Sequence, residues 1–147
     1  MNWKELFLVP QGRVGREAFL IGAAGLIVAG MALSLIPVLG PLAGLALLYP
    51  WTCLLAKRLH DFGRSGWLVL VPAIPTAVSG VLALVTAFAA ANAATMGAAL
   101  AGAGLALTVS GAAVLISVAF LVWAAVKPGD AHANRFGPPA PPLALAV

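Results

Sequence analysis

The segment with the greatest variety of reactive side chains is Lys57–Trp67, which reads Lys-Arg-Leu-His-Asp-Phe-Gly-Arg-Ser-Gly-Trp. Arg58 precedes Asp61 by three residues and Lys57 precedes it by four, so on a helix either base is able to pair with the acid. The glycines allow the chain to turn, and Ser65 is a suitable cap for a following helix. Structural roles therefore account for most of the segment.

The segment carries more basic charge than these structural roles require, and the excess suits an anionic partner. The segment sets three bases and His60 against a single acid, Asp61. A basic residue near anionic lipid contributes about 1 kcal/mol to binding, and an acidic protein surface is a similar target. Basic residues beside apolar helices also fix the orientation of a membrane protein. A specific anion site and a role in orientation alone both remain open.

The residues do not indicate catalysis. His60 and Asp61 are neighbours in sequence and so point apart on a helix. No serine or cysteine has an evident base, and the single cysteine, Cys53, lies in an apolar stretch where a thiol is usually a buried apolar group. The metal-binding spacings CxxC and HExxH do not occur. We expect neither an enzyme nor a metal or other cofactor, and we expect His60 to fix the loop conformation.

Two other polar segments accompany the first, one near each end of the chain. In Gly12–Phe19, Arg13 and Arg16 share a face if the segment is helical, and Glu17 is able to pair with Arg13. The tail segment, Gly129–Pro138, is rich in turn-forming residues. We expect all three segments to meet at one membrane face. The candidate binding or structural network there consists of Arg13, Arg16, Arg58, His60, Asp61, Arg64, Ser65, Trp67, Asn134 and Arg135.

The composition indicates that most of the chain lies in a lipid bilayer. Hydrophobic residues make up 63% of the 147 residues and charged residues 8%, whereas a soluble domain carries about 25% charged residues. The eight basic residues are too few to support nucleic-acid binding. We therefore predict an all-α polytopic membrane protein.

Charged residues are absent from residues 18–56 and from residues 65–126. Because a spanning helix needs about 20 apolar residues, each stretch is long enough for two helices. Pro37–Pro41 breaks the first stretch, since proline disrupts a helix interior, and Asn92–Gly97 is the least apolar part of the second. One re-entrant segment is the alternative for the first stretch. The predicted transmembrane helices are residues 18–36, 40–58, 67–91 and 100–126.

The basic residues also predict the orientation. They lie before the first helix, between the second and third helices, and after the fourth, whereas the other two loops have none. Basic loops remain in the cytoplasm, so we expect both termini there. The apolar run of the first helix exceeds a signal-peptide core, which argues against cleavage. Residues 1–137 are expected to form one membrane domain, and the proline-rich tail, residues 138–147, to be disordered.

Small residues recur at every fourth position of the last predicted helix, at Ala98, Gly102, Ala106 and Ser110. Such stripes allow close backbone approach between helices in lipid. They indicate packing within one four-helix bundle or, alternatively, assembly of a homo-oligomer.

The polar segments also carry a resemblance to a known family. Gly12–Arg16 followed by Phe19, the segment Arg58–Trp67 and the closing Asn134–Pro138 resemble the DUF805 family of small bacterial inner-membrane proteins of uncharacterised function. The resemblance spans about residues 3–138. It implies a multi-pass protein of the bacterial inner (plasma) membrane, and it implies no activity.

The chain departs modestly from the family pattern that it resembles. Lys57 stands where arginine is usual, Leu68 stands where a second tryptophan is common, and a usual glycine is missing before Asn134.

Two functions are consistent with these patterns. The first is an interaction or regulatory protein that uses the basic cytoplasmic cluster to bind a protein or an anionic lipid headgroup. The alternative is a small-solute transporter or channel subunit that acts as an oligomer. Ion and proton pathways usually place an ionisable residue within the helices, and the predicted helices carry charge only at Lys57 and Arg58, where the second one ends. The first interpretation is therefore preferred.

Overall fold

The computed structural model describes residues 3–36, 39–92 and 96–140, and every regular element among them is helical. The elements are α1 (Trp3–Leu8), α2 (Arg16–Ser34), α3 (Leu39–Asp61), the 3-10 helix η1 (Gly66–Val69), α4 (Leu70–Ala91) and α5 (Met96–Val126).

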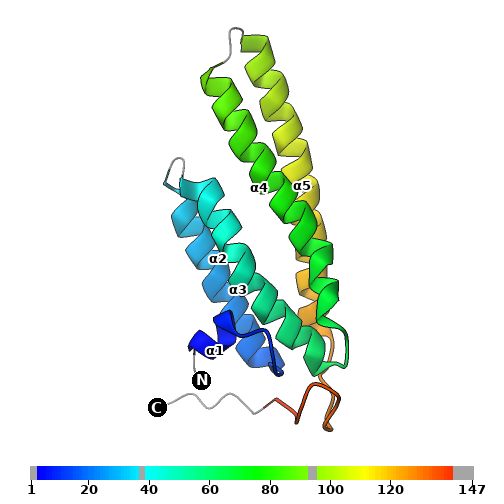
Figure 1. Ribbon diagram of the computed structural model, residues 1–147. Coiled ribbons are helices and arrows are strands. Elements are labelled where there is room, and N and C mark those ends of the chain that lie inside the picture. The colour runs from blue at the N-terminus through cyan, green and yellow to red at the C-terminus, as the bar shows by residue number, and fades with distance from the viewer. Residues whose placement is uncertain (1–2, 37–38, 93–95, 141–147) are drawn as a thin grey trace.

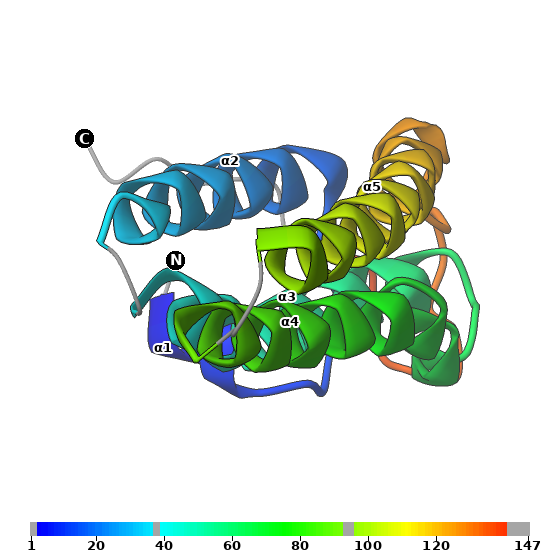
Figure 2. The same cartoon turned by 90° about the horizontal axis from the view of Figure 1, so that it is seen from above.

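The long helices form two hairpins that share one end. α2 packs against α3, and α4 packs against α5. Figure 1 shows the two hairpins close together at the end that holds α1 and the tail, and spreading apart toward the other end. Seen from above in Figure 2, α2 and α5 lie along one side of the molecule and α3 and α4 along the other. The α4–α5 hairpin is the taller of the two.

The packed core lies at the shared end and in the α2–α3 hairpin. Phe19, Leu54 and Leu59 are fully buried there, and Leu6 of α1 joins the same cluster. Gly22 lets α2 approach α3 closely, because a Cβ added to it would lie 3.1 Å from a methyl group of Leu54. This close approach places the core between the elements that carry the charged segments.

The α4–α5 hairpin instead exposes most of its apolar side chains. Only Pro72 of α4 and Ala113 and Ala124 of α5 are buried. Among the described residues, three helical stretches are long and apolar enough to cross a membrane, namely Arg16–Ser34, Gly66–Ala91 and Met96–Val126. Exposed apolar surface of this extent requires a hydrocarbon solvent, and the chain is accordingly a multi-pass membrane protein.

Four long helices lie near the predicted ranges, with differences at their ends, but among the described residues α3 is not one of the stretches long and apolar enough to cross a membrane. α2 begins earlier, at Arg16, and α3 continues through the charged residues to Asp61. The third predicted helix opens as the 3-10 turn η1 before α4, and α5 begins at Met96. The short helix α1 was not predicted.

Parts of three predicted features lie outside the described residues. These are residues 37–38 of the first hairpin turn, residues 93–95 of the second turn, and residues 141–147 of the proline-rich tail.

Candidate functional site at the charged base

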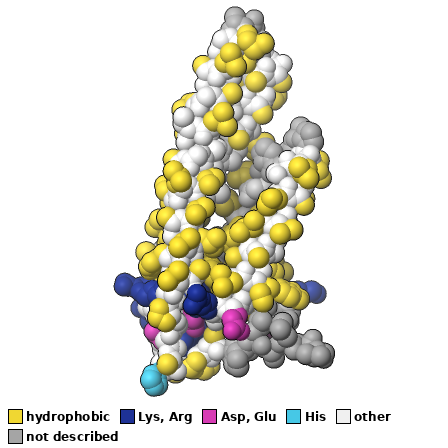
Figure 3. All heavy atoms as spheres, turned by 180° about the vertical axis from the view of Figure 1, so that it is seen from behind, with side chains coloured by type: hydrophobic (Ala, Val, Ile, Leu, Met, Phe, Trp, Pro, Cys, Tyr) yellow, Lys and Arg dark blue, Asp and Glu magenta, His cyan; other side chains and the backbone are white. Residues whose placement is uncertain are grey.

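The shared end of the hairpins holds α1, residues 9–16, the segment from the end of α3 through η1, and residues 127–140, and we call it the charged base. Figure 3 shows charged side chains of both signs gathered at this end, below the long apolar surfaces.

Asp61 bridges two arginines from different parts of the chain. Its Oδ1 accepts from Nε and Nη2 of Arg13 at 3.1 and 3.0 Å. Its Oδ2 accepts from Nη1 of Arg58 at 2.6 Å. The side chains of Arg13, Asp61 and Arg58 are 2%, 5% and 0% exposed. Charge-assisted hydrogen bonds shielded from water are among the strongest in proteins, so this triad fixes the geometry of the base.

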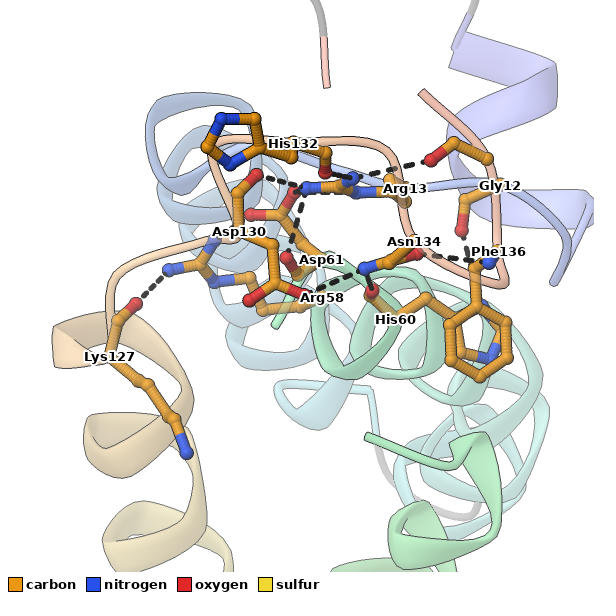
Figure 4. A network of polar contacts seen from close by, with 11 residues as sticks. Gly12, Arg13, Arg58, His60, Asp61, Lys127, Asp130, His132, Asn134 and Phe136 are labelled. Carbon is orange, nitrogen blue, oxygen red and sulfur yellow. Dashed lines mark hydrogen bonds and ion pairs between the residues drawn. The ribbon is translucent and has the colours of Figure 1, made fainter. Parts of the chain in front are cut away.

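Arg13 also ties the N-terminal segment to the tail. Its Nη1 donates to the carbonyl oxygens of His132 at 2.9 Å and Gly137 at 3.3 Å. Its Nη2 donates to the carbonyl oxygens of Asp130 at 2.6 Å and Asp61 at 3.1 Å. Figure 4 shows the guanidinium surrounded by these acceptors. Every nitrogen of the Arg13 guanidinium therefore has a partner inside the protein.

Arg58 joins the end of α3 to the end of α5. Its Nε donates to the carbonyl of Ala124 at 2.9 Å, and its Nη2 donates to that of Lys127 at 2.5 Å. The last carbonyls of a helix lack partners within it and form the negative end of its dipole. The same guanidinium lies over the rings of Phe19 and Phe62, at 5.9 and 5.7 Å. One buried side chain thus caps α5 and binds it to the core.

Gly129 is required where the tail passes Asp61. A Cβ at this position would lie 2.1 Å from Oδ2 of Asp61, which is closer than any real contact. The next residue, Asp130, donates its backbone N–H to the carbonyl of Asp61 at 2.7 Å. Sequence reasoning missed Gly129 as a site residue, since only the folded position of the carboxylate reveals its importance.

His60 is held between the N-terminal segment and the tail. Its ring stacks on Phe136 with centroids 3.9 Å apart and planes 9° apart. Its Nδ1 lies 3.1 Å from the carbonyl oxygen of Gly12, and because a carbonyl only accepts, Nδ1 carries the proton. These contacts support the predicted role of His60 in fixing the loop.

The environment of His60 disfavours its charged form. Burial lowers the pKa of His60 below its usual value, and the charge of Arg135 lowers it further, while the Gly12 carbonyl partly opposes both effects. His60 lies in the charged last turn of α3, beyond the apolar part of that helix.

Asn134 closes the tail over the same loop. Its Nδ2 donates to the carbonyl of His60 at 3.0 Å and to Oδ2 of Asp130 at 2.8 Å. Its Oδ1 accepts from the backbone N–H of Phe136 at 2.9 Å, which positions the stacking ring. Backbone bonds between Asn134 and Gly137 complete the turn, in which Gly137 has a φ of 126°.

A family model described as "Protein of unknown function (DUF805)" matches residues 7–138. The chain belongs to the DUF805 family. No curated protein and no solved structure matches it. The segment matched by the DUF805 model contains the whole triad, Gly129 and the tail turn that ends at Gly137.

Two predictions about pairing in this DUF805 protein are decided by the geometry. Arg58, and not Lys57, pairs with Asp61. Lys57 is buried and donates through Nζ to the backbone carbonyl of Glu5 in α1. Arg13 pairs with Asp61 across the fold, whereas Glu17, its predicted partner on the helix surface, is exposed.

The remaining predicted site residues of the DUF805 chain lie outside the buried triad. Ser65 caps η1 as predicted, with its Oγ accepting from the backbone N–H of Trp67 at 3.4 Å. Arg135 is exposed and donates to the carbonyl of Gly63 at 3.4 Å. Arg16, Arg64 and Trp67 are exposed on the base.

Proposed function

We propose that this chain is a four-span protein of the inner (plasma) membrane, with both termini in the cytoplasm, that acts by binding and not by catalysis. In this proposal the buried triad holds the charged base rigid, and exposed arginines on the base bind anionic lipid headgroups.

The observation that carries the proposal is the division of the arginines into two sets. The side chains of Arg13 and Arg58 are buried and donate to acceptors within the protein. Among the described residues, every buried side-chain nitrogen or oxygen has a hydrogen-bond partner. A ligand would have to break these bonds to reach the triad. Arg16 and Arg64 are instead exposed, so a ligand reaches them without disturbing the base.

The surroundings of the exposed arginines favour lipid over other anions. Trp67, three residues after Arg64, is 79% exposed. Tryptophan is enriched at membrane interfaces because its ring is apolar and its N–H is polar. Each arginine near an anionic surface adds about 1 kcal/mol to binding. Together these residues suit a headgroup at the edge of the bilayer.

A binding role also fits the state of the His60 imidazole. The imidazole of His60 is engaged by the Gly12 carbonyl on Nδ1 and by Phe136 on its face. A Cβ added to Gly66 would lie 3.0 Å from Nε2 of His60, so the backbone closes in on that side. A general acid or base needs an imidazole within reach of its substrate, and these contacts leave His60 a positioning role.

The proposed four-span topology rests on α3 as the fourth crossing. α3 pairs with α2 along its length, and its charged residues are confined to its last five residues, Lys57–Asp61, which lie at the base beside the other basic segments.

The lipid proposal is tested by native mass spectrometry of the purified protein with added phosphatidylglycerol or phosphatidylcholine. The double variant Arg16→Gln/Arg64→Gln should lose most phosphatidylglycerol adducts and keep the thermal stability of the lipid-free protein. The charge-conserving control Arg16→Lys/Arg64→Lys should retain the adducts.

Equal retention of phosphatidylglycerol by the wild type and the glutamine variant would overturn the lipid proposal. Loss of a cross-linked acidic protein in the same variant, with lipid adducts unchanged, would replace lipid by a protein partner.

A further inference from the structure

A cavity of about 330 Å³ lies between the two hairpins. Side chains from α2, α3, η1, α4 and α5 line it, so both hairpins contribute to its walls. Its volume is at the lower end of the range for small-molecule sites. Figure 3 shows from behind how the hairpins part above the base.

The walls of the cavity are largely apolar and partly open. Trp51 and Leu55 of α3 form part of one wall. Val114 and Val118 of α5 also line it, although they are 59% and 51% exposed. The cavity therefore reaches the outer surface of α5, which is apolar and suited to hydrocarbon. A ligand enters it from the bilayer more readily than from water.

Five hydroxyl groups interrupt the apolar lining, from Thr52, Thr76, Ser79, Ser110 and Ser117. A hydroxyl group has one hydrogen to donate and two lone pairs that accept. The positions of the hydrogens therefore decide which ligand atoms the cavity is able to bind.

Four of these hydroxyls already donate their hydrogens within the protein, and three of them donate to a backbone carbonyl of their own helix. Thr52 donates to the carbonyl of Leu48 at 2.7 Å. Thr76 donates to that of Pro72 at 2.7 Å. Ser79 donates to the carbonyl of Thr76 at 2.9 Å.

Ser117 is the fourth hydroxyl whose hydrogen is engaged within the protein. Its Oγ lies 3.2 Å from Oγ1 of Thr76, and because the Thr76 hydrogen is engaged by Pro72, Ser117 is the donor of this pair. The hydroxyls of Thr52, Thr76, Ser79 and Ser117 therefore have acceptor capacity left and no hydrogen to offer. Ser110 makes no hydrogen bond to another described residue and keeps its hydrogen, so acceptors outnumber donors in the lining.

We propose that this cavity binds a neutral amphiphile, an uncharged and mostly apolar molecule that carries one hydroxyl or N–H donor. The apolar walls take the hydrocarbon body, and a serine or threonine oxygen accepts from the donor. A charged ligand is excluded because the lining has no charged group to pair with it. A bare hydrocarbon chain fits the walls but leaves the acceptor oxygens unused.

The proposal is tested by quenching of Trp51 fluorescence with two matched probes, bromoundecanol and bromoundecane, in detergent micelles. A variant that keeps Trp51 and replaces the tryptophans at positions 3, 67 and 123 by phenylalanine reports on the cavity alone. Bromoundecanol should quench saturably at a concentration about tenfold lower than bromoundecane, because only the alcohol donates a hydrogen bond.

Two further variants assign the difference to the hydroxyls. Thr76→Val/Ser117→Ala nearly conserves volume and should abolish the preference for the alcohol while leaving quenching by bromoundecane unchanged. The control Thr108→Val removes an exposed hydroxyl of α5 that donates to the carbonyl of Leu105, and should keep the preference.

Filling the cavity gives an independent readout. Ala113 is 3% exposed and lines the cavity, so Ala113→Leu should abolish saturable quenching by both probes. Its neighbour Ala112 is exposed, and Ala112→Leu should have no effect. Equal quenching by the two probes in the Trp51 reporter, or a preference that survives Thr76→Val/Ser117→Ala, would overturn the proposal.

Discussion

At the residue scale, Asp61 places one negative charge between the buried guanidinium groups of Arg13 and Arg58. Removing one member of a buried ion pair leaves uncompensated charge and typically costs about 3–5 kcal/mol. The polar contacts of Arg13 and Arg58 with backbone carbonyls remain after such a change, but both cations lose their counterion.

We predict that Asp61→Asn lowers the free energy of unfolding by about 3 kcal/mol, measured by thermal or denaturant unfolding in detergent. The control is Asp130→Asn, because Asp130 is exposed and its side chain accepts from Asn134. This variant should cost about 1 kcal/mol or less. An Asp61→Asn protein as stable as the wild type would show that the triad does not hold the base.

His60 should make stability depend on pH. Its pKa in the folded protein is lowered by burial, so the unfolded chain, with a histidine pKa of about 6.5, binds the proton first. The contribution of neutral His60 is therefore complete above about pH 6.5, declines as the pH falls below that value, and is lost once the pH has passed the folded pKa.

The measurement is the midpoint of thermal unfolding as a function of pH in that range. His60→Gln should flatten the decline at low pH. The exposed His132, which contributes its backbone carbonyl to Arg13, supplies the control His132→Gln, and this variant should retain the wild-type profile.

Contacts between residues close in sequence were predictable, and those between distant segments were not. The three-residue spacing predicted that Arg58 is able to pair with Asp61, and Ser65 caps the next helix as expected. Arg13 pairs with Asp61, 48 residues away. Glu17 is only four residues away and would be able to pair with Arg13 if the segment between them were helical. The fold decides between them, because it buries Asp61 beside Arg13 and leaves Glu17 exposed.

At the element scale, the charge pattern predicted the long helices but not their ends. α3 continues to Asp61 because Lys57, Arg58 and Asp61 find partners in α1, α5 and the N-terminal segment. The residues of α1 do not by themselves indicate a helix, since so short a helix is unstable alone. It is held here by Leu6 in the core and by Lys57 on the Glu5 carbonyl.

The passage of the tail over the end of α3 gives a prediction at this scale. Gly129→Ala places a methyl group against the Asp61 carboxylate, so the tail has to move away and the hydrogen bonds from Arg13 to the tail weaken. We expect a loss of about 2–4 kcal/mol of stability and faster hydrogen exchange in residues 130–137.

Gly25→Ala is the matched control. A Cβ there meets nothing within 4 Å, and alanine is favoured over glycine inside a helix by about 1 kcal/mol, so this variant should be as stable as the wild type or more stable. Equal stability of the two variants would contradict the steric argument for Gly129.

At the scale of the whole molecule, the proposed topology places every basic segment on one side of the membrane. Single cysteines introduced at Arg64 and at Arg135, both exposed on the base, in a Cys53→Ser background should react with a membrane-impermeant maleimide only after the cells are opened. A cysteine at exposed Leu35, near the far end of α2, should react in intact cells. Labelling of position 64 in intact cells would contradict a cytoplasmic base.

The unequal hairpins have a consequence for the surrounding lipid. α2 has 19 residues and α5 has 31, which correspond to lengths of about 28 Å and 46 Å, against a hydrocarbon thickness of about 30 Å. α2 matches that thickness upright, whereas α5 remains within it only by tilting or by drawing longer lipids around itself. Because Arg58 joins α3 to the end of α5, a tilt of α5 changes the angle between the hairpins. The angle between the hairpins is therefore expected to change with the thickness of the membrane.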